Sequence, residues 1–176
     1  METQQASVKK IAINYGLMLS LITIAVSVIV YVMGMTYDQP WWQSAINFIA
    51  MTAIIIYAIK AFKAGNGGFL SLGDALKVGL AIALVAGIIG SLFTYIFVEF
   101  IEPNFVTNML AVTQERMIEQ NPNMTEEQMD MAMGMTEKMM SPVIMIAIGI
   151  IASLFFGFII SLIAGLIMKQ PKPAHL

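Results

Sequence analysis

The sequence predicts an all-α integral membrane protein: four transmembrane helices, with an extracytoplasmic helical hairpin between helices 3 and 4. Three observations support this class: the composition, four long apolar runs, and the distribution of lysine and arginine. Of the 176 residues, 59% are hydrophobic and only 11% are charged, and the mean hydropathy is +0.81. A soluble domain carries roughly 25% charged residues. This chain therefore has too few charges to cover a surface exposed to water.

The four apolar runs are long enough to cross a bilayer, whose core of about 30 Å requires about 20 helical residues. The expected spans are 11–35, 42–62, 76–100 and 143–168, within a single membrane domain that covers residues 1–176. The runs are continuously apolar and lack the alternation of a membrane β-barrel. Lys9 and Lys10 precede the first run as in a signal peptide, but the run is too long and no small-residue cleavage site follows it. We therefore expect a retained anchor.

Basic residues predict the orientation, because lysine and arginine are enriched in cytoplasmic loops. Seven of the nine lie near the N-terminus, in the second connection or near the C-terminus: Lys9, Lys10, Lys60, Lys63, Lys77, Lys169 and Lys172. We therefore expect both termini in the cytoplasm and the third connection, which is rich in acidic residues, outside. Tyr37, Trp41 and Trp42 are expected at the outer interface, where aromatic residues gather.

Several function classes lack the residues they need. The chain has no cysteine, which excludes thiol catalysis, disulfides and thiolate metal sites. A net charge of −2 gives no basic surface for nucleic acid. No ionisable residue lies deep in a span, which leaves no proton relay and no voltage sensor. Glu99 and Glu102 are expected to be solvated interfacial acids rather than a carboxylate pair, and the only histidine, His175, lies in the C-terminal tail. We expect no enzyme activity, cofactor or metal.

Small residues form a ladder in two of the spans. They recur every four positions and so share one helix face. The fourth span carries Gly149, Ser153, Gly157, Ser161 and Gly165, and the third carries Gly79, Ala83, Gly87 and Ser91. Small residues let membrane helices approach closely. We favour packing of the two faces within one chain over a homo-oligomer or a partner helix. Gly16, Ser20, Thr23 and Ser27 form a similar stripe in the first span, expected at an interhelical contact.

Two connections carry recognisable helix signals. Residues 65–74 contain four glycines and place Ser71 three residues before Asp74, which indicates a turn followed by a capped helix. We favour this interpretation over a phosphate cradle, because the spacing of nucleotide-binding loops is absent. Residues 102–141 predict two helices, one over about 104–120 and one that starts with a Thr125–Gln128 capping box and reaches about Met140.

The same outward segment holds nine of the 16 methionines. The run Met129-x-Met131-x-Met133-x-Met135 resembles the thioether arrays that select Cu(I). On a helix, however, only Met129 and Met133, and likewise Met131 and Met135, share a face. We favour an amphipathic surface that rests on the membrane or on a partner, with Cu(I) binding as the alternative.

The chain is similar to a family of uncharacterised bacterial membrane proteins, common in Bacteroidetes and catalogued as a domain of unknown function. The resemblance is carried by Lys9-Lys10 leading into Asn14-Tyr15-Gly16, by the loop 67–79 and by the turn 121–129. It implies a four-span protein of the bacterial cytoplasmic (inner) membrane with an outward helical segment, and it implies no catalytic residue, substrate or cofactor.

These observations lead us to expect a non-enzymatic protein that acts through helix–helix or extracytoplasmic contacts. It would be an accessory subunit, a scaffold or a self-associating module. Its expected partners are the lipid bilayer and either a second copy of the chain or another membrane protein. The alternative is a small transporter or a Cu(I)-handling or other metal-handling protein that uses the methionine-rich outer hairpin.

Overall fold

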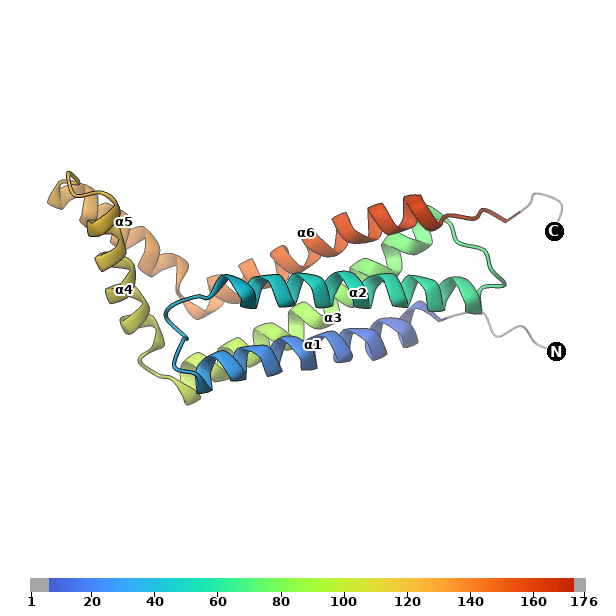
Figure 1. The fold of residues 1–176 in the computed structure, drawn as a ribbon, viewed down its shortest axis with the longest axis horizontal. Helices are drawn as coiled ribbons and strands as arrows, with labels where there is room; N and C mark the ends of the chain where they lie inside the picture. Colours follow the sequence, from blue (N-terminus) through green and yellow to red (C-terminus); the bar gives the residue numbers. More distant parts are fainter. Residues whose placement is uncertain (1–6, 173–176) are drawn as a thin grey trace.

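A computed structural model describes residues 7–172 and contains four long helices and a shorter helical pair. The long helices, which lie side by side (Figure 1), are α1 (Val8–Val32), α2 (Trp41–Gly65), α3 (Leu72–Ile96) and α6 (Pro142–Met168). All four are long and apolar enough to cross a membrane. The pair α4 (Phe105–Gln120) and α5 (Glu126–Met139) forms a hairpin at the end of the bundle opposite the start of α1 and the end of α6. The predicted fold class is confirmed.

The half of the bundle near the start of α1 and the end of α6 is called the terminal half below. The half near α4 and α5 is called the hairpin half.

Side-chain caps start α3 and α5 at the predicted positions. The Ser71 hydroxyl accepts the Asp74 backbone N–H at 3.0 Å and donates to the Asp74 carboxylate at 2.6 Å, which starts α3. Thr125 and Gln128 form the full capping box of α5. Gly67 and Gly68 have φ angles of 68° and 86°, so the turn after α2 uses a conformation that favours glycine.

The helix boundaries differ from the apolar runs where a cap lies outside the run. Helix α1 starts at Val8, three residues before its run, because the Ser7 side chain accepts the Lys10 backbone N–H. Helix α3 likewise starts at Leu72, and it continues into a π-helical turn, η1 (Phe97–Ile101). Hydropathy marks the segment that lipid can cover, whereas capping side chains decide where the helix begins.

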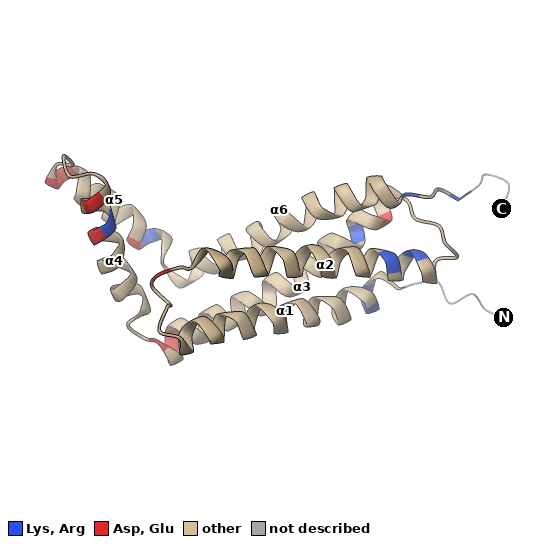
Figure 2. Cartoon of the chain, in the orientation of Figure 1, with Lys and Arg blue, Asp and Glu red and all other residues tan. Residues whose placement is uncertain are grey.

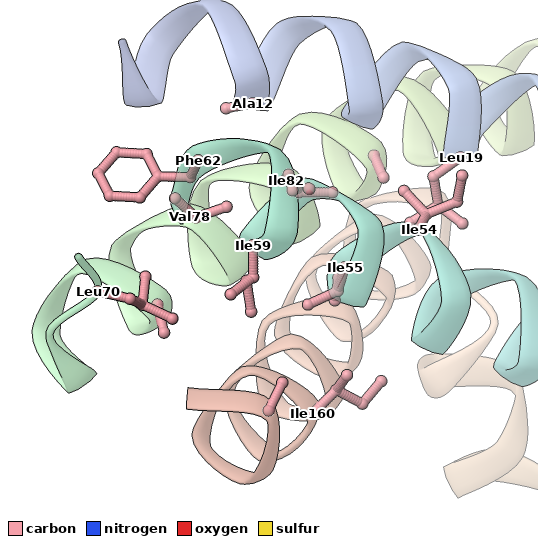
Figure 3. Packing of buried hydrophobic residues seen from close by; sticks show 14 residues of the cluster. Ala12, Leu19, Ile54, Ile55, Ile59, Phe62, Leu70, Val78, Ile82 and Ile160 are labelled. Carbon is pink, nitrogen blue, oxygen red and sulfur yellow. The ribbon is translucent and has the colours of Figure 1, made fainter. Parts of the chain in front are cut away.

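The hydrophobic core lies mainly in the terminal half. Helix α3 is central and packs against α1, α2 and α6. Figure 3 shows side chains from all four spans meeting there, and the fully buried members include Ile55 and Ile59 of α2 and Val78 and Ile82 of α3. Close packing of this kind, together with hydrogen bonds, holds helices together in lipid.

Hydrogen bonds close the end of the terminal half. Leu70 and Gln170 exchange two backbone hydrogen bonds, at 2.9 and 2.8 Å, and the Leu70 side chain is fully buried. The Lys63 ammonium group donates to the Met168 carbonyl at 3.0 Å. These bonds tie the α2–α3 loop to the segment after α6, so three helix ends meet at one place.

Candidate functional site

The two small-residue ladders face each other across the α3–α6 interface. The helices run antiparallel, so a step of four residues along α3 meets a step of four residues back along α6. The contacts pair Gly79 with Ser161, Ala83 with Gly157, Gly87 with Ser153 and Ser91 with Gly149, and Gly165 lies against Ala75.

The backbones approach too closely at these pairs for larger side chains. A Cβ atom added to Gly165 would lie 2.8 Å from the Ala75 Cβ, and one added to Gly79 or Gly157 would collide with Ser161 or Ala83. At the far end of the ladder the contact is looser, because a Cβ on Gly149 would lie 3.4 Å from the Ser91 hydroxyl. The ladder is therefore tight in the terminal half and relaxed in the hairpin half.

Serine hydroxyls add polar contacts to this interface. Ser153 donates to the Ala83 carbonyl at 2.8 Å and Ser91 donates to the Ile146 carbonyl at 3.4 Å, so both bonds join α3 to α6. Ser161 instead donates within its own helix, to the Gly157 carbonyl at 2.6 Å. In this chain the two small faces contact each other, so most of their surface is already covered.

The methionines of α5 lie on two faces of the hairpin. Met129 and Met133 are half-buried, whereas Met131 and Met135 are 73% and 67% exposed. All fourteen residues of α5 are described and none of them is buried. A group of exposed apolar side chains on one helix usually marks a surface that contacts another protein or a membrane.

A polar cluster around Tyr37 attaches α4 to the loop between α1 and α2. The Tyr37 hydroxyl donates to Glu102 Oε1 at 3.0 Å and accepts from Asn108 Nδ2 at 3.0 Å. Arg116 donates to the Tyr37 carbonyl at 2.9 Å. Burial raises the pKa of the Tyr37 phenol, and the neighbouring Glu102 carboxylate raises it further, so the phenol stays protonated and remains a donor.

Sequence reasoning missed this cluster. It placed Tyr37 at the interface as an aromatic anchor and treated Glu102 as a solvated acid beside Glu99. In the structure Glu99 is exposed, but Glu102 is partly buried and bonded to Tyr37. The partners of Tyr37 lie between 65 and 79 positions away in the chain. No local spacing signals such a contact.

Among residues 7–172, no three or more His, Cys, Asp or Glu side chains lie together in a position to hold a metal ion. Of the two methionine pairs that the sequence proposed as ligands, only Met131 and Met135, one turn apart, are exposed in the described structure. His175 lies outside the described residues.

Four apolar spanning helices around a packed core define a multi-pass α-helical membrane protein. The chain belongs to the family described as "Protein of unknown function (DUF4199)", whose model matches residues 14–170. The resemblance to a domain of unknown function, noted in the sequence, is thereby confirmed. Comparisons with curated proteins and with solved structures found no match.

Proposed function

We propose that the protein is a non-enzymatic bacterial inner-membrane protein that acts through contacts of its extracytoplasmic hairpin with another membrane protein. The observation that supports this proposal is the contrast between two candidate surfaces. The small faces of α3 and α6 contact each other inside the chain, whereas α5 buries none of its residues. Helix α5 is therefore the surface best suited to a partner.

The charge of the hairpin favours a particular kind of partner. Residues 102–141 hold seven acidic side chains and two basic ones. Two copies of this hairpin would repel each other, and anionic lipid headgroups would repel it as well. A partner with a basic outer surface and an apolar patch for Met131 and Met135 fits the surface best.

The proposed orientation follows from the charges at the two ends of the bundle. Figure 2 shows most lysines near the start of α1 and the end of α6, and most acids near the hairpin. The enrichment of basic residues on the cytoplasmic side supports cytoplasmic termini and an external hairpin.

Cysteine labelling tests this orientation without background, because the chain has no cysteine. A membrane-impermeant maleimide should label Asn123→Cys, in the α4–α5 turn, in intact spheroplasts. It should label Lys172→Cys only after the membrane is permeabilised. The reverse pattern would exclude an external hairpin.

The partner is tested by native mass spectrometry of the protein extracted in mild detergent from its own membranes at natural abundance. We expect one stoichiometric companion protein with the wild-type chain. The companion should be lost with Met131→Glu/Met135→Glu, because the added charges oppose burial, and retained with Met131→Leu/Met135→Leu, which keeps the apolar surface. A chain that migrates alone or only with itself, or a companion that survives the glutamate substitutions, would contradict the proposal.

Cu(I) handling, including a transport role, is the second candidate function. It is favoured by one observation, the exposure of two thioethers one helical turn apart. Titration of the full-length protein with Cu(I) against a chromophoric Cu(I) chelator tests it. Met131→Leu/Met135→Leu should abolish binding if copper is the ligand, while leaving any protein companion in place. Equal Cu(I) affinity in the variant and the wild type would remove this candidate.

A further inference from the structure

A cavity of about 670 Å³ lies between all four spans in the hairpin half of the bundle. It exists because α2 packs closely only in the terminal half: the buried residues of α2 begin at Ile54, whereas its cavity-lining residues, from Ser44 to Met51, come earlier. Leu19 and Ala86 line the cavity and also belong to the hydrophobic core, so the core forms its floor. Pockets of about 300–1,000 Å³ commonly hold small ligands.

A glycine keeps the middle of this cavity open. Gly90 is the midpoint of the α3 segment that lines it, Ala86 to Thr94. It faces the bundle interior, because the exposed Ile88 lies two residues earlier, about 200° around the helix. A Cβ atom added to Gly90 would nevertheless meet no described atom within 4 Å outside its immediate surroundings. An inward-facing position with no neighbour indicates space for a ligand.

The polar groups of the cavity are all neutral. Its lining includes Thr23, Ser27, Ser44, Asn47, Ser91, Thr94 and Ser153, and none of the described lining residues is ionisable. In a low-dielectric site without a partner charge, a charged ligand would bind at a large desolvation cost. The remaining wall is apolar and includes Phe48 and Phe156, whose rings meet edge to face at 6.0 Å. The ligand should therefore be an uncharged amphiphile.

The hydrogen-bond inventory favours a ligand that donates. Thr23, Ser27 and Thr94 each donate to a carbonyl of their own helix, at 3.0 Å, and so retain free acceptor lone pairs. A hydroxyl group on the ligand would satisfy these acceptors.

A second cavity adjoins the first on its hairpin side. It measures about 240 Å³, shares Ser27, Phe93 and Thr94 with the first, and extends to Gln39 and Gln43 in the loop and first turn beneath α4. Together the two cavities extend toward the hairpin end, while the packed core closes the terminal end.

We infer that the four-helix cavity in the hairpin half binds a neutral amphiphile with an apolar body and a hydroxyl-bearing head. Diacylglycerol has this chemistry. The inference does not depend on the partner protein proposed above, because the cavity and the exposed face of α5 share no residue.

The test uses the full-length protein in phosphatidylcholine nanodiscs and a dioctanoylglycerol that carries a diazirine in one acyl chain. After irradiation, peptide mass spectrometry should place the label on lining residues such as Met51 and Met145. Unlabelled dioctanoylglycerol should compete. Its O-acetyl derivative, which has lost the donor, should compete about tenfold less well, and so should dioctanoyl phosphatidic acid, which is charged. Equal competition by all three, or label confined to the lipid-facing surface, would overturn the inference.

A cavity-filling variant sharpens the test. Gly90→Phe should abolish saturable labelling, whereas Gly134→Phe, at a similarly open glycine in α5, should leave it unchanged. Thr23→Val/Thr94→Val keeps the side-chain shapes but removes two of the hydroxyl acceptors. It should reduce the preference for the hydroxyl over the O-acetyl ligand, so it decides the question if Gly90→Phe fails to fold. Wild-type labelling of a folded Gly90→Phe protein would exclude the cavity as the site.

Discussion

Glycines have opposite effects on packing in the two halves of the bundle. In the terminal half, Gly79, Gly157 and Gly165 leave no room for even one added methyl group, and α3 and α6 are in contact along their backbones. In the hairpin half, Gly90 of α3 also faces the bundle interior, but a Cβ atom added there would enter open space. A small residue brings helices together only where the facing helix follows it closely. Where the facing helix diverges, as α2 does before Ile54, the same residue leaves a cavity.

The largest expected effect is the response to a leucine at the two kinds of glycine. Gly157→Leu should separate α3 and α6 and destabilise the fold by about 1–3 kcal/mol or more, as overpacking does. Gly90→Leu should change stability little, because its side chain enters free space. Thermal unfolding in detergent, followed by circular dichroism, measures both. Equal destabilisation of the two variants would break the distinction between the halves.

The second effect concerns the attachment of the hairpin. Tyr37→Phe removes the hydrogen bonds to Glu102 and Asn108 and should loosen α4 by about 1 kcal/mol. Hydrogen exchange of the α4 amides should become faster, while exchange around Ile55 and Ile59 in the terminal half stays unchanged. Slower or unchanged exchange in α4 would show that the cluster does not hold the hairpin in place.

A smaller effect on the unfolding free energy is expected in the middle of the α3–α6 interface, where the contacts between the small residues become looser. Ser153→Ala removes a hydrogen bond between α6 and α3 and should cost about 0.6 kcal/mol, the average for such bonds in membrane proteins. Ser161→Ala is the matched control, because its hydroxyl bonds within α6 and no interhelical bond is lost. The difference between the two variants in unfolding free energy, rather than either value alone, reports the interhelical bond. A larger loss from Ser161→Ala would contradict this assignment.

The smallest expected effect at physiological pH is that of a pH change on the Tyr37 cluster, because the phenol titrates only at alkaline pH. The pKa of the phenol is raised in the folded state, so its contribution is fully present below the ordinary tyrosine pKa of 10.0 and is lost as pH rises through the higher folded value. Exchange of the α4 amides, corrected for intrinsic rates, should show no pH dependence from Tyr37 between neutral pH and that point, and loosening above it. Tyr37→Phe should lack the alkaline loosening. Wild-type loosening below pH 8 would point to another group.

The sequence predicts the elements of this protein better than their relative positions. The spans, the Ser71 cap and the Thr125–Gln128 box follow from local spacing, and each occurs in the structure. The stripe from Gly16 to Ser27, which we expected at an interhelical contact, shows the limit of this reasoning. Only the part of the stripe nearer the start of α1 packs closely: a Cβ atom added to Gly16 would lie 2.6 Å from the Val85 side chain.

The part of that stripe in the hairpin half, Thr23 and Ser27, lines the cavity instead. Spacing identifies residues that share a face, but the divergence of α2 arises from contacts between helices distant in the chain. For the same reason the spacing places Gly87 on the ladder, where it contacts Ser153, but does not indicate that Gly90 faces open space.

The antiparallel pairing of α3 with α6 also has a consequence in time. Gly79 and its partner Ser161 on α6 are separated by 82 positions, including the whole of the hairpin. At a synthesis rate of about 5–20 residues per second, Gly79 is made roughly 4–16 s before Ser161. During that interval the hairpin must cross the membrane if it is external, and the small face of α3 has no partner within its own chain. The nascent protein is therefore most open to rival helices, and to membrane chaperones, in the seconds before its last span is made.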